Sequence, residues 1–220
     1  NPLKTLWFKQ GHFMVQDAAS MLAAHLAGPE PGALILDSCA APGGKATHLA
    51  ALSGGRAVVI AQDRYPGRIA RIQENCARLA VSNVYALCAD AMVPPFPDNF
   101  FDVVLVDAPC SGLGTLRRHP EIKWRAADTP PQQLAGVQCA MLRKAVKVCK
   151  NGGLIIYSVC TLTPEETVEV VSKIAGEGTC APEDGPESFN SWKTAQGQYQ
   201  TTPADEAWDG FFLTRFRKQS

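Results

Sequence analysis

Short apolar runs rich in β-branched residues alternate along this chain with stretches of helical periodicity, and this alternation constrains the fold more than any other feature. The runs are 33–37 (ALILD), 57–63 (AVVIAQD), 84–90 (VYALCAD), 102–107 (DVVLVD) and 153–158 (GLIIYS). Their hydrophobicity is nearly continuous, which is typical of parallel strands covered by helices on both faces. We therefore expect these five runs to form one parallel sheet.

Helical patterns occupy the segments between the runs. The helix expected over 66–80 has an apolar stripe made of Ile69, Ile72, Cys76 and Leu79. The helix expected over 132–150 has a stripe made of Leu134, Val137, Met141, Ala145 and Val148. A third helix is expected over 164–175, where a proline and two glutamates suit a first turn. Strands that alternate with helices predict an α/β fold with a doubly wound sheet.

Four of the five expected strands end in, or just before, an aspartate. These are Asp37, Asp63, Asp90 and Asp107. Each of them could simply cap the turn or helix that follows. Ligands of doubly wound sheets bind outside the carboxyl ends of the strands. Four aspartates at matching positions therefore predict a polar rim around one ligand.

The ends of the chain are less regular. The stretch 176–210 is rich in Gly, Pro, Ser, Thr and acidic residues, so we expect loops around one weak strand, followed by a final strand over 211–216. The chain begins at Asn1, without Met and without a basic-then-apolar leader, and is expected to come from a longer protein.

The composition excludes several classes of protein. Lys and Arg number 21 and Asp and Glu number 21, so the formal net charge is zero, and 46% of the residues are hydrophobic. This balance excludes disorder over most of the chain. The longest apolar run, 84–89, is far shorter than the ~20 residues that span a bilayer, so no membrane segment is expected.

The 8 cysteines do not form the dense framework of a small secreted domain, and we expect free thiols in a reducing cytoplasm. No two of them make a C-x-x-C pair, and the 4 histidines lack metal-ligand spacing. We therefore expect no metal site.

The first chemical motif, Asp37-Ser-Cys-Ala-Ala-Pro-Gly-Gly-Lys45, follows the first expected strand directly. It is not a phosphate loop, because Cys39 and Ala46 stand where that pattern needs Gly and Ser or Thr. The G-x-G-x-x-G fingerprint is absent as well, which disfavours NAD. Consecutive glycines still allow backbone amides to approach a ligand near the positive end of the next helix.

Two more motifs, Asp107-Ala-Pro-Cys-Ser-Gly112 and Tyr157-Ser-Val-Cys-Thr161, follow the fourth and fifth expected strands. With CAAPGGK they resemble the RNA cytosine-5 methyltransferase family. The resemblance extends to 11–20 (GHFMVQDAAS) and 209–212 (DGFF), and so covers almost the whole chain. Residues 114–125 (GTLRRHPEIKWR) are especially similar to bacterial members that methylate a cytosine of 16S ribosomal RNA.

The resemblance implies a Rossmann-like class I methyltransferase fold, with a mostly parallel, seven-stranded, doubly wound sheet and an antiparallel strand near the C-terminus. Residues 31–220 would form the methyltransferase domain, and residues 1–30 a helical segment packed on it. It further implies a cytoplasmic monomer that uses S-adenosyl-L-methionine and acts on a single-stranded or locally unpaired cytosine, above all in ribosomal RNA.

The resemblance also implies cofactor-binding residues. The methionine part of the cofactor would be held by Cys39, Ala40, Ala41, Pro42, Gly43, Gly44 and Lys45. Asp63 would bind the ribose hydroxyls with Arg68 nearby, and Asp90 would meet the adenine amino group. Members of the family often carry a second acidic residue after the position of Asp63, where this chain has Arg64-Tyr65.

By the same resemblance, Asp107 would border both the cofactor and the target base, Cys160 would be the nucleophile, and Cys110 would help to release the product. The chemistry agrees, because cytosine C5 attacks a methyl group only after a thiolate has added to C6. Such a thiolate needs a polar, partly exposed site, and a carboxylate could stabilise the adduct. If the fourth and fifth strands are neighbours at ~4.8 Å, both cysteines face one pocket. The alternative is a pair of buried structural thiols.

Two groups of basic residues suggest an RNA partner. Four positive charges fall within nine residues at Arg117, Arg118, Lys123 and Arg125. One face of the helix expected over 66–80 carries a second group, namely Arg64, Arg68, Arg71 and Arg78. Either group could be ordinary solvated surface, or could bind splayed RNA whose target base is flipped into the pocket.

Other functions stay open: methylation of tRNA, DNA, protein or a small molecule, or a non-catalytic role in RNA binding or assembly. Cys110 stands where an amino-group methyltransferase would want an aromatic residue, and DNA cytosine-5 enzymes have their nucleophile in that fourth-strand motif. Cys160 therefore favours an RNA enzyme, and the presence of both cysteines disfavours a non-catalytic protein.

Overall fold

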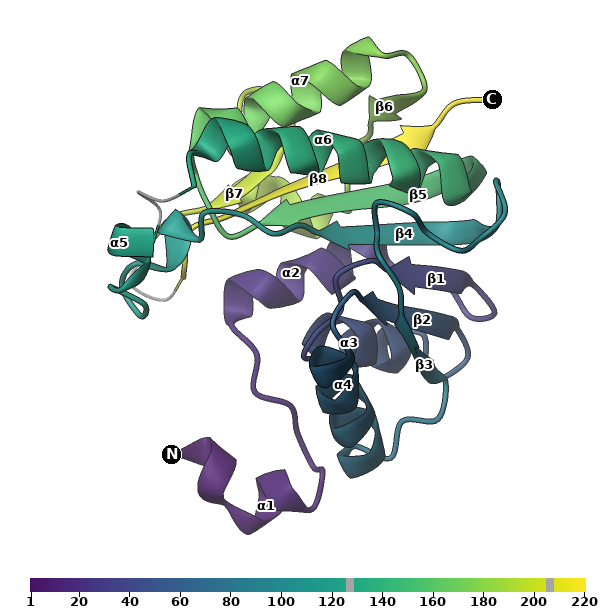
Figure 1. The fold of residues 1–220 in the computed structure, drawn as a ribbon, viewed down its shortest axis with the longest axis vertical. Helices are drawn as coiled ribbons and strands as arrows, with labels where there is room; N and C mark the ends of the chain where they lie inside the picture. The colour runs from purple at the N-terminus through teal and green to yellow at the C-terminus, as the bar shows by residue number, and fades with distance from the viewer. Residues whose placement is uncertain (126–128, 205–207) are drawn as a thin grey trace.

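Eight strands form one sheet in the computed structural model, which describes residues 1–125, 129–204 and 208–220 (Figure 1). Five strands run parallel in the order β3-β2-β1-β4-β5. They are β1 (Leu34–Asp37), β2 (Val58–Asp63), β3 (Val84–Cys88), β4 (Phe101–Asp107) and β5 (Cys149–Val159). β8 (Phe211–Lys218) pairs antiparallel with β5. The doubly wound sheet and the antiparallel C-terminal strand are thus confirmed.

The sheet has one strand more than the seven expected. The stretch 176–210 contributes both β6 (Cys180–Pro182) and β7 (Tyr199–Thr201), where one weak strand was expected. β6 pairs with the last three residues of β8 and β7 with its first three. β8 is long enough for both, because its eight residues present one edge to β5 and leave the other edge for two short strands.

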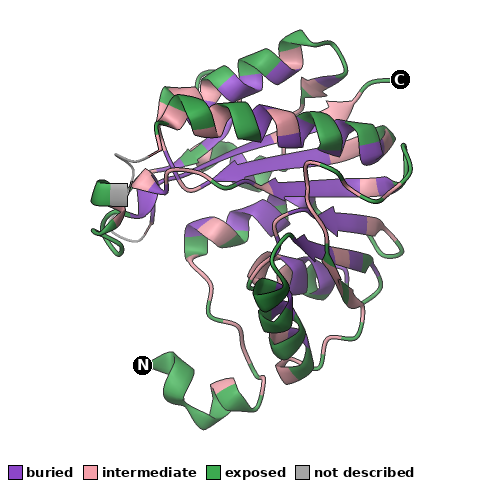
Figure 2. Ribbon diagram, viewed as in Figure 1, coloured by how far each residue is buried: buried purple, intermediate pink, exposed green. Residues whose placement is uncertain are grey.

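Helices cover both faces of the sheet (Figure 1). One face packs against α2 (Ala18–Ala27), α3 (Gly44–Leu52) and α4 (Pro66–Arg78), and the other against α6 (Pro131–Val148) and α7 (Val168–Gly176). In β1, Ile35 belongs to the first apolar cluster and Leu36 to the second. β1, β2, β4 and β5 are therefore buried along most of their length (Figure 2), which explains their continuous hydrophobicity, whereas the edge strand β3 has no buried residue.

The helix predictions hold in part. α4 buries Ile69, Ile72 and Cys76 as predicted. The third helix begins as a separate turn, η3 (Pro164–Glu166), before α7. The stripe predicted on α6 is wrong at its start, because Leu134 is only half-buried and Val137 is 38% exposed. Val137 is exposed because it lines a cavity, described below, instead of packing in the core.

The N-terminal segment has two parts. Its first turns, η1 (Pro2–Lys4) and α1 (Leu6–Lys9), bury no residue, whereas α2 packs into the core. Arg78 of α4 fixes the segment between α1 and α2 to the rest of the chain. Its Nη1 donates to the carbonyls of Phe8 and Phe13 at 2.8 and 3.0 Å. The division at residue 30 stays a prediction.

The other short elements are η2 (Leu113–Thr115), α5 (Ile122–Arg125) and η4 (Glu187–Trp192). All eight cysteines are free thiols in the structure. Among the described residues, none of the helices has the length and apolar character needed to cross a membrane.

Candidate active site

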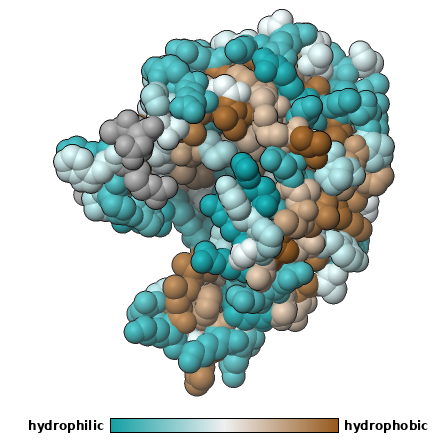
Figure 3. Space-filling model, viewed as in Figure 1, coloured by the Kyte–Doolittle hydropathy of each residue, from teal (hydrophilic) through white to brown (hydrophobic). Residues whose placement is uncertain are grey.

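The carboxyl ends of the parallel strands open into a cavity of about 440 Å³. They point toward the side of the molecule that carries α5 (Figure 1), and the surface is hollowed there, between α5 and the N-terminal segment (Figure 3). The predicted site residues that line this cavity are Cys39, Ala41, Asp63, Arg68, Asp90, Asp107, Cys110 and Cys160. Residues from the ends of all five parallel strands therefore meet at one place, as their positions after the strands predicted.

The two motif cysteines lie next to each other at the wall of this cavity. Cys110 follows β4 and Cys160 follows β5, and these strands pair in register with Asp107 opposite Ser158. The two Sγ atoms are 3.2 Å apart. The hydrogen bond from Cys110 lowers the pKa of the Cys160 thiol, with Lys45 adding to the effect, while the same contact raises the pKa of Cys110. Cys160 is therefore the thiol that ionises first.

Asp107 is oriented from two sides. Lys45 Nζ lies 2.7 Å from Oδ2, and Ser158 Oγ donates to Oδ1 at 2.7 Å. Lys45 Nζ also lies 5.3 Å from the centre of the Phe211 ring. The structure thus brings the ammonium group of Lys45 to Asp107, and Lys45 is not among the residues that line the cavity.

Most of the glycine-containing loop shapes the chain instead of facing the cavity. Ala40, Pro42, Gly43 and Gly44 do not line it. Gly43 has a φ of +101° at the N-cap of α3, a conformation that favours glycine. A Cβ on Gly44 would lie 3.7 Å from the side chain of Gln16. Gly43 therefore allows the turn into α3, whereas the space at Gly44 would accept a Cβ at ordinary contact distance.

The far end of the cavity carries carboxylates beside an aromatic ring. Asp63 is 4% exposed, accepts a hydrogen bond from the amide of Tyr65 at 3.1 Å, and lies 3.7 Å from Arg68 Nη1. The guanidinium groups of Arg64 and Arg68 each lie 5.0 Å from the centre of the Tyr65 ring. Asp90 accepts from the amide of Met92 at 2.9 Å. This end offers hydrogen-bond acceptors and a flat apolar surface.

Asp37 is an exception to the predicted rim of four aspartates. It has no exposed surface and does not line the cavity. Burial, and then the nearby charge of Asp107, raise its pKa to about 7. The prediction is wrong at Asp37, because its carboxyl group is enclosed within the protein instead of facing the cavity.

Several lining residues were missed from the sequence. Tyr65, Met92, Val137 and Met141 line the cavity, and the sequence placed the last two in a helix stripe facing the core. A stripe alone does not show where a helix passes the edge of the sheet. Ser158 lies inside the YSVCT motif, but its bond to Asp107 depends on the register of β5 against β4.

Two of the basic residues singled out in the sequence, Arg78 and Arg118, form hydrogen bonds or ion pairs within the protein. Arg118 Nε donates to the buried carboxylate of Asp209 at 2.9 Å, and its Nη2 lies 3.1 Å from Asp17. Arg78 binds the N-terminal segment as described. These contacts tie both arginines to the fold, and their contact with RNA stays a prediction. Lys123 is exposed, while the side chain of Arg125 lies outside the described residues.

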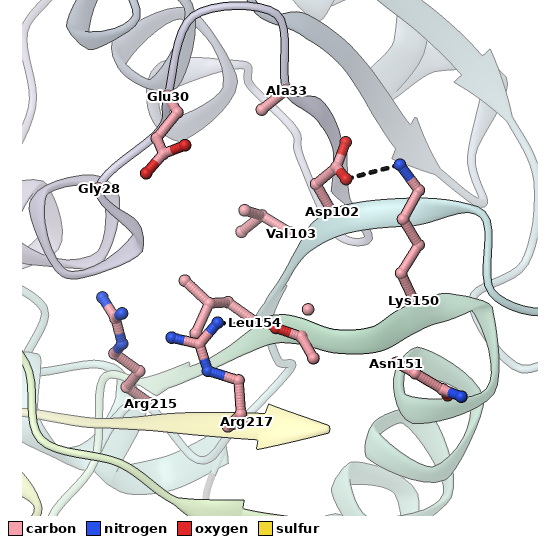
Figure 4. Close-up of a pocket in the computed structure, with 12 residues that line it drawn as sticks. Gly28, Glu30, Ala33, Asp102, Val103, Lys150, Asn151, Leu154, Arg215 and Arg217 are labelled. Carbon is pink, nitrogen blue, oxygen red and sulfur yellow. Dashed lines mark hydrogen bonds and ion pairs between the residues drawn. The ribbon is translucent and has the colours of Figure 1, made fainter. Parts of the chain in front are cut away.

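A second pocket, of about 290 Å³, lies at the opposite end of the strands (Figure 4). Its cationic side chains already have carboxylate partners. Lys150 pairs with Asp102 at 2.6 Å, and Glu183 binds both Arg215 and Arg217. Among the described residues no group of three or more His, Cys, Asp or Glu could hold a metal ion.

The doubly wound sheet, with a cavity at the carboxyl ends of its strands, defines a Rossmann-like methyltransferase fold. The chain belongs to the 16S rRNA methyltransferase RsmB/F family, whose model matches residues 24–217. It is 37% identical to ribosomal RNA small subunit methyltransferase B of Vibrio vulnificus, over 97% of this chain and 49% of the relative. It is 33% identical to the probable methyltransferase B of Synechocystis, over 96% of this chain and 49% of the relative. The chain thus spans about half the length of these curated relatives.

Solved structures show the same similarity. NSun6 from Pyrococcus horikoshii with SFG matches with a TM-score of 0.83 and 28% identity, over 99% of this chain and 56% of that one. A methyltransferase homolog protein from the same organism matches with a TM-score of 0.78 and 28% identity, over 99% and 72%.

Proposed function

We propose that the chain transfers a methyl group from S-adenosyl-L-methionine to C5 of a cytosine in RNA, above all ribosomal RNA, through a covalent bond between Cys160 and C6. The observation that carries the proposal is the thiol pair, 3.2 Å apart at the wall of the cavity beside Asp107. The names of the two curated relatives, both of them ribosomal RNA small subunit methyltransferases, support the choice of substrate.

The cavity fits the cofactor. Its volume, its acceptors at Asp63 and Asp90 and the exposed ring of Tyr65 suit an adenosyl group, whose ribose hydroxyls and adenine amino group are hydrogen-bond donors. Cys39 and Ala41 would border the methionine part. When bound, the cofactor supplies a methyl group that is electrophilic because it is attached to a sulfonium.

The two thiols and Asp107 would carry out addition to the base, its orientation and the release of the product. The Cys160 thiolate adds to C6, and the electron pair of the ring then makes C5 nucleophilic. C5 would then take the methyl group as its bond to the sulfonium breaks, which leaves a neutral thioether. Asp107, held by Lys45 and Ser158, would meet the edge of the base and orient it. For release, the C5 proton leaves to a base, the electron pair returns to the ring, and the C6–S bond breaks. Cys110 would donate a hydrogen bond to the departing Cys160 thiolate.

Single replacements of the two thiols test this mechanism. Cys160→Ala should bind RNA but neither methylate it nor become linked to it. Cys110→Ala should form the adduct and stall at release, leaving a protein–RNA species that survives denaturing electrophoresis and disappears in the double variant. Cys180→Ala is the matched control, because that buried thiol lies in β6, away from the cavity.

A trapped species in Cys160→Ala would reverse the two roles. Full activity in both variants would refute the mechanism. The substrate class is tested with the same assay on small-subunit ribosomal RNA, tRNA and DNA, and methylation of DNA alone would refute the choice of RNA.

A further inference from the structure

A fully buried carboxylate lies behind the two thiols, outside the wall of the cavity. Glu166, the last residue of η3, has no exposed surface. Its Oε2 accepts hydrogen bonds from the Ser111 amide and from Gln138 Nε2, both at 2.9 Å. Its Oε1 accepts from Thr163 Oγ1 at 3.1 Å. A buried carboxylate with three donors is a strong set of contacts, because hydrogen bonds to a charged acceptor are about twice as strong as neutral ones.

These contacts reach both sides of Cys110. Ser111, the next residue, is bound through its amide by Glu166. Pro109, the residue before, accepts at its carbonyl from Gln138 Nε2 at 3.0 Å, and Gln138 is itself bound to Glu166. The peptide groups that flank Cys110 are therefore both fixed to one buried centre.

The same centre is linked to the strand that carries Cys160. Tyr157, in β5, places its hydroxyl 2.6 Å from the Glu166 carbonyl oxygen. Ser111 Oγ donates to Thr161 Oγ1 at 2.9 Å, and Thr161 directly follows Cys160. Two loops that are 50 residues apart in sequence are thus joined by Glu166 and its neighbours.

We propose that Glu166 is a positioning residue for the paired thiols, and that it keeps Cys110 within hydrogen-bond distance of Cys160 by fixing the loop around Cys110. The catalytic consequence rests on the proposed function, whereas the positioning itself does not. Buried polar networks of this kind act as a unit, and a partly satisfied network loses its geometry.

The direction of a shift in thiol reactivity separates positioning from a simple effect of charge. If Glu166 acted only as a negative charge, its removal would favour the Cys160 thiolate and lower the pKa of Cys160. If Glu166 positions Cys110, its loss removes a hydrogen bond from Cys160 and raises that pKa. The charged groups near Cys160 come from other elements, namely Asp107, Lys45 and Arg118, and the test leaves them unchanged.

The experiment measures alkylation of Cys160 by iodoacetamide against pH in the full chain, with the modified residue identified by peptide mass spectrometry. We expect Glu166→Ala to move the profile to higher pH, in the same direction as Cys110→Ala, with at least a threefold slower reaction near pH 7. Glu166→Gln should not move it upward, because the amide oxygen still accepts from Ser111 and Gln138 while the amide nitrogen donates to Thr163.

Two further variants keep the test decisive. Glu183→Ala removes a carboxylate with several hydrogen bonds at the opposite end of the sheet, and it should leave the profile unchanged. Gln138→Ala removes the bond to Pro109 and should shift the profile upward even where Glu166→Ala does not fold, as judged by thermal unfolding. A profile that is unmoved or lowered in both Glu166→Ala and Gln138→Ala overturns the proposal, as does an equal shift in Glu183→Ala.

A second readout links the inference to catalysis. With RNA and cofactor, Glu166→Ala should accumulate the same covalent species as Cys110→Ala, whereas a general loss of stability would reduce adduct and product together. A shifted alkylation profile without any covalent species in Cys110→Ala would refute the proposed function and leave the positioning role intact. A covalent species in Cys110→Ala, with unshifted alkylation profiles in both Glu166→Ala and Gln138→Ala, would refute the positioning role and leave the proposed function intact.

Discussion

Asp37 ends β1 as a carboxyl group with no exposed surface, and its raised pKa, about 7, has a consequence for stability. A carboxyl group that holds its proton more tightly in the folded than in the unfolded state stabilises the fold below the unfolded pKa. That contribution is lost as the pH rises toward the folded value. The group therefore destabilises the folded chain at and above neutral pH.

We expect the unaltered protein to lose on the order of 2–3 kcal/mol of unfolding free energy between pH 5 and pH 8 through Asp37, whose pKa is raised from 3.8 to about 7. Asp37→Asn should remove most of this loss, and should therefore be the more stable protein at pH 8 but not at pH 5. Urea unfolding of both proteins at the two pH values measures the effect. The same pH dependence in both proteins would contradict it.

Asp63 is the residue at which cofactor binding can be tested with a single replacement. If its carboxylate accepts from the ribose hydroxyls, Asp63→Ala should weaken binding of S-adenosyl-L-methionine by about 1–3 kcal/mol, because buried hydroxyls are left without a partner. Titration calorimetry measures this loss. Asp98→Ala is the matched control, since Asp98 is exposed and pairs with Lys147. An unchanged affinity in Asp63→Ala would contradict the assignment of the ribose site.

At the scale of elements, two glycines let η2 cross the start of β8 next to Cys160. The Gly210 amide donates to the Gly114 carbonyl at 2.8 Å, and the Gly114 amide donates to the Cys160 carbonyl at 3.0 Å. A Cβ on Gly114 would lie 1.9 Å from the Gly210 carbonyl oxygen. The backbone around Cys160 is therefore held by a crossing that only glycine permits.

We expect Gly114→Ala to reduce the unfolding free energy by about 2 kcal/mol or more, because backbone has to move, and to lower methylation further by displacing Cys160. Gly136→Ala is the matched control. Gly136 lies within α6 with nothing within 4 Å of its Cβ position, so this change should stabilise the chain by about 0.5–1 kcal/mol. Equal effects in the two variants would show that the crossing is not tight.

At the scale of the whole molecule, charge is balanced, yet basic side chains remain on both sides of the cavity. Arg71 is exposed on α4, and Lys123 is exposed on α5 (Figure 1). Arg118 is unsuitable as a probe of RNA binding, because its loss would leave the buried carboxylate of Asp209 poorly compensated.

We expect Arg71→Ala and Lys123→Ala each to lower RNA affinity and to reduce the slope of log affinity against log salt by roughly one. Cofactor affinity should not change, since neither residue lines the cavity. Filter binding over a series of salt concentrations measures the slopes. Slopes equal to that of the unaltered protein would assign both side chains to ordinary solvated surface.

The parts of this protein that the sequence determined by itself are those with a local signal. Continuous apolar runs located β1 to β5. In β1, β2, β4 and β5 the reason is burial on both faces, which leaves no polar alternation, whereas β3 is an edge strand without a buried residue. Because the carboxyl ends of parallel strands share one edge, the motifs at those ends predicted that Cys110 and Cys160 would meet.

Only the tertiary structure decided which partners the charged side chains take. Lys45 binds Asp107, 62 residues away, and Arg118 binds Asp209, 91 residues away. Glu166 occupies an unremarkable helix start in the sequence, yet it binds Ser111 across 55 residues. No spacing rule reports such contacts, because they depend on strand register and on where separate loops come together. The sequence therefore predicted that the two thiols would meet, and the folded chain determined which side chains hold them in place.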